Sequence, residues 1–195
     1  MWVLFYFLAA QAHAITIDLS ARPNLNFYSW DAIQSELHGV DPNDVTELLL
    51  DHVNLTRIPK WIFEKMPNLH MLSLERNQIT VIDPDIKKLT KLTSLNLAEN
   101  DLRHIEPVLP LVKLRGLNLR CNKIEDLPDD IGKLKRLRFF SLRENRLQLL
   151  PKSIKRLTRV DKFDLYGTPI LEKSEGAYLG KSDLAQYFGG RIILS

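Results

Sequence analysis

An eleven-position pattern of leucines and asparagine recurs along most of this chain at nearly constant spacing. In its clearest copy, LRGLNLRCNKI, the template L-x-x-L-x-L-x-x-N-x-L is filled by Leu114, Leu117, Leu119, Asn122 and Ile124. Six copies follow one another at intervals of 22 to 24 residues, with first positions at Val45, Leu69, Leu92, Leu114, Leu137 and Val160. One copy would mean little because leucine is common, but six in register predict a repeat architecture over residues 45–170.

The positions within each copy predict a short strand followed by a turn. Side chains alternate faces along a strand, so we expect the fourth and sixth positions to face the core and the third, fifth and seventh to face outward. The ninth position is asparagine in the four middle copies, where its amide can bond backbone groups that a tight turn leaves unpaired. This predicts a structural ladder of Asn77, Asn100, Asn122 and Asn145.

The second half of each copy narrows the class of repeat. Residues 58–62, 127–131 and 150–154 carry a proline at the second of five positions and isoleucine at the fifth, whereas residues 82–86 and 105–109 place the proline one residue late. The chain therefore resembles leucine-rich repeat proteins, and among them the 23-residue repeats of the Ras-suppressor and soc-2-like group. The resemblance implies an α/β leucine-rich repeat solenoid, curved, with a parallel sheet on the concave face and short helical or irregular segments on the convex face.

Residues 15–44 are predicted to form an N-terminal cap, because a repeat array leaves its first apolar face and strand edge bare. Apolar and polar residues alternate over residues 15–20, which is typical of a half-buried strand. A short helix is expected to begin at Ser29, whose hydroxyl can cap free backbone N–H groups, and to end near Gly39.

Residues 171–195 are predicted to form a C-terminal cap. After Ile170 the repeat register is lost, and the next residues read as a loop. A helix is expected from Ser182 to the Gly-Gly pair at residues 189–190, followed by a closing strand or extended tail. These elements supply apolar residues where the core of the array would otherwise end.

Residues 1–14 support two interpretations. A continuous apolar run, WVLFYFLAA, precedes Ala12-His13-Ala14, which is typical of a signal peptide cleaved after Ala14 and would make the protein secreted or extracytoplasmic. A bilayer span needs about 20 residues, more than this run provides. No Lys or Arg precedes the run, however, so a wrongly assigned start or a buried strand is the alternative, with a cytoplasmic location.

Several classes of protein are disfavoured by composition. A net charge of +3 gives no reason to expect nucleic-acid binding, and no Cys/His set has the spacing of metal ligands. No nucleophile–base or carboxylate pair is apparent, so we expect a protein that is not an enzyme. We also expect it to hold no cofactor and to be a monomer. The single cysteine, Cys121, is either a plain surface thiol or a reactive one activated by neighbouring Arg120.

The candidate binding site lies on the outward strand positions, which can vary without harming the core. Charge there changes from acidic in the first repeat, with Glu47 and Asp51, to basic in the fourth and fifth. Arginine and aromatic residues most often carry interface energy. The predicted partner-binding residues are Arg115, Arg120, Arg138, Phe139, Arg143 and Tyr166. The alternative is a solvated charged sheet in which Arg143 pairs with Glu144 or another neighbour.

Two functions follow from these observations. The first is a protein–protein interaction module that binds a protein through its concave face, as an adaptor or regulator of signalling. The second is a secreted or host-targeted recognition protein that binds an anionic ligand, glycan or lipid headgroup through its arginines. The convex face is basic near the C-terminus, where it carries Lys152, Lys155, Arg156 and Arg159. A weak contact between this face and an anionic surface is therefore a further alternative.

Overall fold

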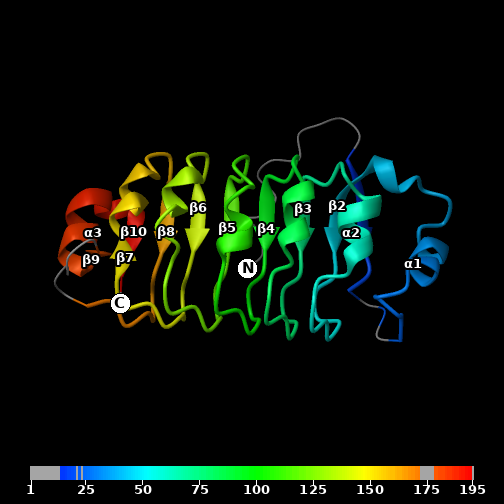
Figure 1. Ribbon diagram of the computed structural model, residues 1–195, viewed down its shortest axis with the longest axis horizontal. Helices are drawn as coiled ribbons and strands as arrows, with labels where there is room; N and C mark the ends of the chain where they lie inside the picture. The colour runs from blue at the N-terminus through cyan, green and yellow to red at the C-terminus, as the bar shows by residue number, and fades with distance from the viewer. Residues whose placement is uncertain (1–13, 21, 23, 172–177, 195) are drawn as a thin grey trace.

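The computed structural model describes residues 14–20, 22, 24–171 and 178–194, so the predicted signal segment lies outside the described residues except for Ala14. The chain forms one elongated solenoid in which parallel strands line one side and short helices the other (Figure 1). The strand order follows the chain order, β1-β2-β3-β4-β5-β6-β8-β10, as expected when each repeat stacks on its predecessor. The predicted fold class, a leucine-rich repeat solenoid, is confirmed.

The sheet is built from one short strand per repeat, with one further strand at each end. Each strand is parallel to its neighbours, and equivalent positions pair in register, so Gly116 lies beside Phe139 and Leu117 beside Phe140. The strands are β1 (Ile15–Asp18), β2 (Val45–Leu49), β3 (Met71–Ser73), β4 (Ser94–Asn96), β5 (Gly116–Asn118), β6 (Phe139–Ser141), β8 (Lys162–Asp164) and β10 (Ile192–Ile193).

A return segment on the opposite side leads from each strand to the next. Each contains a single helical turn or little more, and proline stands at or just before the start of several. These helices are α2 (Lys60–Lys65) and the 3₁₀ helices η2 (Pro84–Lys88), η3 (Glu106–Val108), η4 (Ile131–Lys133) and η5 (Lys152–Arg156). Each sends apolar side chains inward, including Ile62, Ile86, Val108, Ile131 and Ile154.

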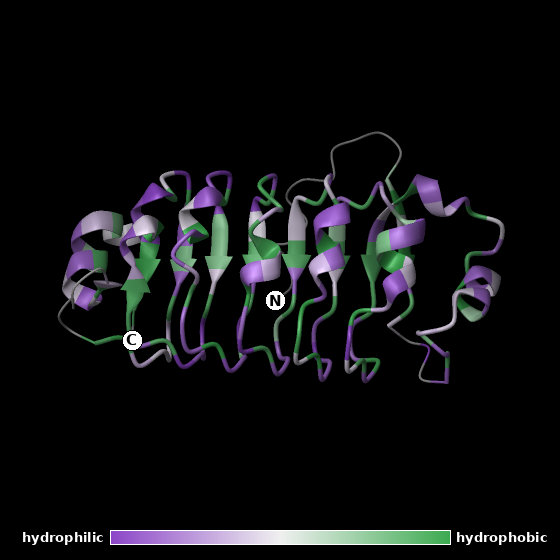
Figure 2. Cartoon of the chain, viewed as in Figure 1, coloured by the Kyte–Doolittle hydropathy of each residue, from purple (hydrophilic) through white to green (hydrophobic). Residues whose placement is uncertain are grey.

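The core lies between the two layers and runs the length of the solenoid. The fourth and sixth strand positions of all six repeats are completely buried, as predicted, and the strands are correspondingly apolar (Figure 2). The fourth position is leucine in the first four repeats but Phe140 and Phe163 in the last two. These two rings stack with centroids 5.2 Å apart, and Phe188 packs edge-on against Phe163 at 5.3 Å.

The four asparagines form a ladder that crosses every repeat boundary in the middle of the solenoid. Asn122 Nδ2 donates to the carbonyl of Leu97 in the preceding repeat at 2.9 Å and to that of Leu119 in its own at 3.1 Å. Its Oδ1 accepts from the N–H of Leu102 at 2.9 Å. Equivalent bonds are made by Asn77, Asn100 and Asn145. In the last repeat Thr168 takes this place, and its hydroxyl donates to the carbonyl of Leu165.

The N-terminal end is closed by β1, which pairs with β2, and by α1 (Trp30–Glu36). Ser29 caps this helix as predicted, its hydroxyl accepting from the N–H of Ala32, and Gly39 follows the helix with φ +84°. A 3₁₀ helix, η1 (Pro42–Asp44), leads into the first repeat. The indole N–H of Trp61 donates to the carbonyl of Phe27 at 2.6 Å, which fixes this end to the first return segment.

The C-terminal end is closed by α3 (Lys181–Phe188), which begins one residue before the predicted start, then η6 (Gly189–Arg191) and β10. A second, two-stranded sheet pairs β7 (Leu150–Pro151) with β9 (Tyr178–Leu179) in antiparallel orientation. The sequence predicted a loop where β9 forms, and that prediction was wrong. Two residues are too few to show the alternation that identifies a strand.

Candidate protein-binding face

The sheet face consists of the side chains at the third, fifth and seventh positions of each repeat, on the side of the strands away from the helices. The third positions are half-buried along the whole array. The seventh positions are half-buried or exposed except for Ala98, which is buried. The fifth positions were predicted to be open to solvent, but four of the six are buried: Ser73, Asn96, Ser141 and Asp164.

Hydrogen bonds between repeats hold two of the buried fifth positions, Ser73 and Asn96, against the sheet. Ser73 Oγ donates to Asp51 of the preceding repeat at 2.6 Å. Asn96 Nδ2 donates to Ser73 Oγ at 3.1 Å and to Glu75 at 2.8 Å. These short polar side chains are held against the strands beneath longer neighbours. The face that a partner can reach is therefore made by the third and seventh positions together with two half-buried fifth positions, Leu49 and Asn118.

At the N-terminal end of the sheet face, four carboxylates lie on neighbouring strands. They are Asp18, Glu47, Asp51 and Glu75, and among the described residues none of them forms an ion pair. Burial raises the pKa of Asp51, and the negative charges of Glu75 and Asp18 act in the same direction, although hydrogen bonds from Ser73 and the N–H of Glu75 oppose them. This end therefore carries uncompensated negative charge.

At the C-terminal end, by contrast, the arginines of the seventh position are compensated. Arg120 pairs with Glu99 of the preceding repeat, which also pairs with Arg76 at 2.9 Å. Arg143 pairs with Glu144 at 3.1 Å. The Arg143 guanidinium also lies 4.5 Å from the centroid of the Tyr166 ring, a cation–π arrangement.

The six predicted partner-binding residues do not lie together. Arg120, Arg143 and Tyr166 follow the ends of their strands. Arg115 and Arg138 precede theirs, and five residue steps along the chain separate the two groups by about 16 Å. Arg138 is also paired, with Asp161 at 3.1 Å. Phe139 lies between the groups at a third position, with the Lys162 ammonium 5.9 Å from its ring centroid.

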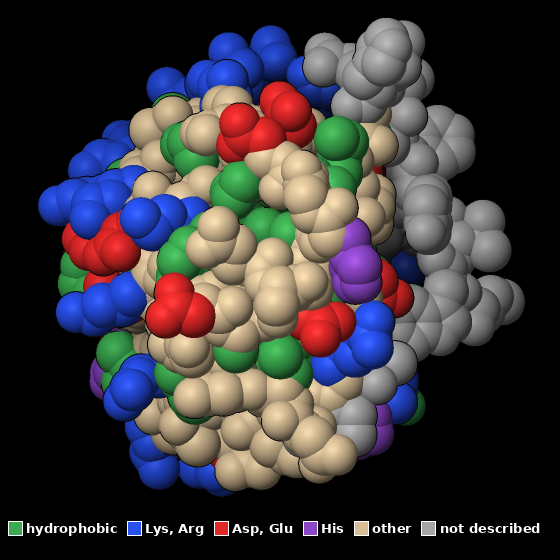
Figure 3. All heavy atoms as spheres, turned by 90° about the vertical axis from the view of Figure 1, so that its right-hand side faces the viewer, with side chains coloured by type: hydrophobic (Ala, Val, Ile, Leu, Met, Phe, Trp, Pro, Cys, Tyr) green, Lys and Arg blue, Asp and Glu red, His purple; other side chains and the backbone are tan. Residues whose placement is uncertain are grey.

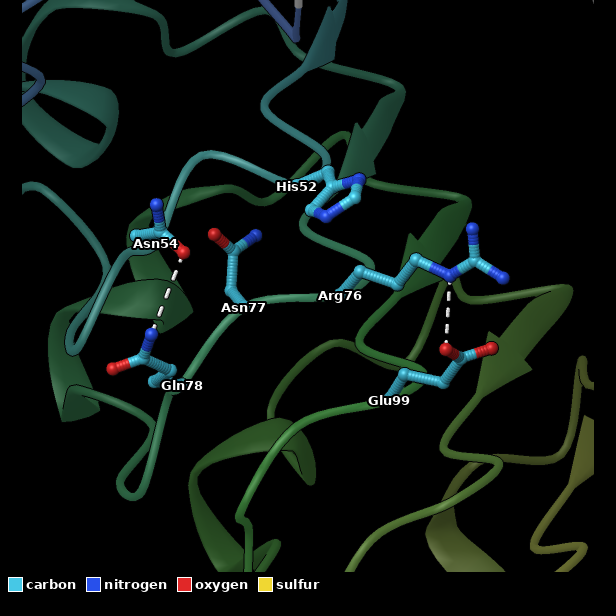
Figure 4. Close-up of a pocket in the computed structure, with 6 residues that line it drawn as sticks. All are labelled: His52, Asn54, Arg76, Asn77, Gln78 and Glu99. Atoms are coloured by element: carbon cyan, nitrogen blue, oxygen red, sulfur yellow. Dashed lines mark hydrogen bonds and ion pairs between the residues drawn. The ribbon is translucent and has the colours of Figure 1, made fainter. Parts of the chain in front are cut away.

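One rim of the sheet is formed by the eighth positions, a feature that the sequence did not reveal. His52, Arg76, Glu99, Cys121 and Glu144 all have left-handed backbones with φ between 53° and 61°. Between the first three repeats this rim encloses a shallow depression of about 410 Å³ (Figure 4), lined by His52, Asn54, Arg76, Asn77, Gln78 and Glu99. Its polar groups bond one another: Arg76 pairs with Glu99, and Gln78 donates to Asn54 at 3.4 Å.

Cys121 lies on this rim but is not an activated thiol. Its Sγ donates to Glu144 Oε2 at 2.7 Å. Partial burial and that bond raise the pKa of the Cys121 thiol to about 11, and the charge of Arg120 only partly opposes them. The thiol is therefore protonated at neutral pH, which favours a plain surface thiol over a reactive one.

Within residues 14–20, 22, 24–171 and 178–194, no group of three or more His, Cys, Asp or Glu side chains is placed to hold a metal ion. The helices of the same residues are each too short or too polar to cross a bilayer.

Comparison with known proteins assigns the family. The profile described as leucine rich repeat matches residues 43–102 and 112–170, together more than half of the chain. The chain belongs to the leucine-rich repeat family. It is 33% identical over 95 residues to fibromodulin of Oryctolagus cuniculus, a match covering 49% of this chain and 64% of that protein. The chain thus spans less than two thirds of that relative's length.

Solved structures of this family share the fold. A leucine-rich repeat protein of Leptospira interrogans superposes with a TM-score of 0.69 at 30% identity, over 78% of this chain and 37% of that one. The plant peptide hormone receptor RGFR1, solved in complex with RGF2, superposes with a TM-score of 0.57 at 31% identity, over 66% of this chain and 22% of that one. Leucine-rich repeat proteins generally mediate protein interactions.

Proposed function

We propose that this protein is a non-enzymatic interaction module that binds a protein partner through the sheet face of its repeat array, as an adaptor or regulator of signalling. The family membership supports the general activity. The receptor that superposes on this chain was solved in complex with RGF2, which is consistent with recognition of a polypeptide. The sheet face is long, since it follows a sheet of eight strands, so it suits an extended protein surface better than a small molecule.

The observation that carries this proposal is the arrangement of Arg143 and Tyr166 on neighbouring strands. Tyr166 is 46% exposed although it is aromatic, and the Arg143 guanidinium stacks on its ring. Stacking orders both side chains before a partner arrives, which lowers the entropic cost of binding. Arginine and tyrosine are enriched among the residues that dominate interface energies. The proposed centre of the interface is Arg120, Phe139, Arg143 and Tyr166.

The alternative of an anionic ligand held by the arginines is disfavoured. Each of Arg120, Arg138 and Arg143 already has a carboxylate partner in the protein. An incoming phosphate or sulfate would have to displace that partner, so the arginines offer it little net attraction. The two groups of arginines also lie at opposite ends of their strands. A protein surface that contacts Tyr166 and the arginine stems needs no such displacement.

The test is capture of a partner by wild-type protein and by two matched variants. The first variant combines Arg143→Glu with Tyr166→Ala on the sheet face. The control, Lys65→Glu, makes the same change of net charge on the opposite side, where Lys65 is exposed. A partner identified with the wild type should bind the sheet-face variant at least about 100-fold more weakly, because two central interface residues are lost. Equal loss in both variants would contradict the proposal.

Two finer assignments remain proposals. The proline placement of three repeats supports descent from the Ras-suppressor and soc-2-like group of 23-residue repeats. The apolar run and Ala12-His13-Ala14 support a secreted or extracytoplasmic protein, with a cytoplasmic one as the alternative. Sequencing the N-terminus of purified mature protein separates these, since cleavage leaves Ile15 first whereas an intracellular protein begins at Met1.

A further inference from the structure

The helical side of the last two complete repeats carries a concentrated positive charge that the proposed function does not use. We call this group the C-terminal basic surface. It lies on η4, η5 and the turns that follow them, and consists of Lys133, Lys135, Arg136, Lys152, Lys155, Arg156 and Arg159. Six of the seven side chains are exposed, and Lys155 is half-buried.

The charge of this surface is largely uncompensated. Among the described residues, one of its seven cations forms an ion pair, Lys133 with Asp130 at 2.6 Å. The segment 150–159 contains four cations and no acidic residue. The η4 segment, residues 127–136, contains two aspartates beside its three cations, and residues 83–91 contain two aspartates and three lysines, with Lys88 paired to Asp85 at 2.9 Å. The excess of positive charge is therefore concentrated on residues 150–159. Figure 3 views the molecule from the α1 end, where Lys and Arg side chains gather along the left edge with a few Asp and Glu side chains beside them.

The two segments form a single surface because they pack closely. Gly132 lies so near η5 that a Cβ there would come within 2.3 Å of the Ser153 carbonyl oxygen. The same Cβ would meet the Cβ and Cδ atoms of Arg156 at 3.1 Å, so the Arg156 side chain runs across η4. The absence of a side chain at this position therefore brings the cations of both repeats together.

The C-terminal cap holds the middle of this surface in place and adds an aromatic ring. The Tyr187 hydroxyl donates to the backbone carbonyl of Lys155. The Lys155 ammonium lies 5.6 Å from the centroid of the same ring, and Tyr187 is 36% exposed. Tyrosine beside lysine is a combination found where proteins meet the headgroups of a bilayer.

We propose that the C-terminal basic surface binds the surface of a bilayer rich in anionic lipids, peripherally and without insertion. The cations are spread over two repeats and six of the seven side chains are exposed, which favours a diffuse anionic layer over a single phosphate. Clusters of four to eight Lys and Arg residues recognise such layers. A long sulfated glycan would follow a row of cations along the solenoid, but residues 105–113 interrupt that row with Glu106 and a single lysine.

This surface lies on the helical side, so a bilayer bound there leaves the sheet face open to a protein partner. The two surfaces are on opposite sides of the solenoid in Figure 1. The inference is independent of the proposed function, because either surface can lose its partner while the other keeps its own.

The experiment is co-flotation with vesicles of phosphatidylcholine, with and without phosphatidylserine. Wild-type protein should float with the phosphatidylserine vesicles alone, and added salt should release it because the attraction is electrostatic. The variant Lys152→Gln, Arg156→Gln, Arg159→Gln should lower the vesicle partition coefficient on the order of 100-fold, since each cation contributes about a fivefold factor.

The matched control removes the same net charge from the other end of the helical side. Lys60→Gln, Lys65→Gln, Lys87→Gln changes three exposed lysines that are not ion-paired in the described structure, and should leave the partition nearly unchanged. Circular dichroism of both variants establishes that they fold. The proposal would be overturned if the two variants weakened flotation equally or if the wild type did not float. Retention on a heparin column without any flotation would overturn it in favour of a sulfated glycan.

Discussion

The two ends of the sheet face carry opposite kinds of charge, but they differ more in how that charge is compensated. At the N-terminal end Asp18, Glu47, Asp51 and Glu75 are stabilised by hydrogen bonds and by no ion pair among the described residues. At the C-terminal end the arginines of the seventh position each pair with a carboxylate. A count of the arginines alone makes the C-terminal end basic, whereas the ion pairs with Glu99 and Glu144 neutralise the charge of Arg120 and Arg143.

This difference in charge compensation decides how each end of the sheet face can contribute to binding a protein partner. Compensated arginines contribute their stems and stacked aromatic partners to an interface rather than bare charge, whereas the acidic end contributes a long-range field. The ends also differ inside, because leucine fills the fourth position in the first four repeats and phenylalanine in the last two. The C-terminal half is therefore fixed by ring stacking as well as by repeat packing.

The largest expected effect comes from the core of the C-terminal half. Phe163→Ala removes a ring that packs on both Phe140 and Phe188, and should lower the free energy of unfolding by about 4 kcal/mol. Leu72→Ala, the equivalent change near the other end, should cost about 3 kcal/mol. Chemical denaturation of both variants measures the difference. A cost below about 1 kcal/mol for Phe163→Ala would show that the ring stack does not hold the C-terminal cap.

A smaller effect is expected from removing the shared carboxylate of the rim. Glu99→Gln leaves Arg76 and Arg120 without their partner and close to each other, and should cost about 1 kcal/mol. High salt should reduce this cost, since the side chains are partly open to water. Thermal unfolding at low and high salt measures it. A cost that salt leaves unchanged would argue that packing, not ion pairing, explains the role of Glu99.

At the acidic end, removing a carboxylate should raise the stability of the protein rather than lower it. Burial raises the pKa of Asp51 above its unfolded value, so the contribution of Asp51 to stability is fully present below the unfolded pKa and is lost as pH rises through the folded pKa. Asp51→Asn removes that loss and should stabilise the protein by about 0.5 kcal/mol at neutral pH. Melting curves at neutral and acid pH provide the check. The gain should vanish in acid, and a gain that persists there would contradict the assignment.

The smallest effect concerns Cys121, which lies between the two ends. Because its thiol has a pKa of about 11, alkylation by iodoacetamide should be slow at neutral pH and should accelerate as pH approaches that value. Glu144→Gln should shift the profile to lower pH, because the carboxylate raises the pKa of the thiol. Mass spectrometry of timed samples records the rate. Fast alkylation of the wild type at neutral pH would refute the bond to Glu144.

Periodicity alone was enough to predict the six repeat strands, their register and the buried fourth and sixth positions. Ser29 as a helix cap also followed from residue type. The covered fifth positions did not, because their burial depends on hydrogen bonds such as Ser73 to Asp51 between repeats that the one-dimensional pattern does not place side by side. The pairing of Arg120 was missed for a related reason. Glu99 is close only because the eighth residue of each repeat takes a left-handed turn that directs its side chain along the rim.

The most direct test of the sheet face as the binding surface is site-specific photocrosslinking to the captured partner. A benzophenone amino acid is placed at position 166 on the sheet face or at position 87 on the helical side, in otherwise wild-type protein. Crosslinks to the partner from position 166 and none from position 87 are the predicted result. Crosslinks from position 87 alone would contradict the proposal.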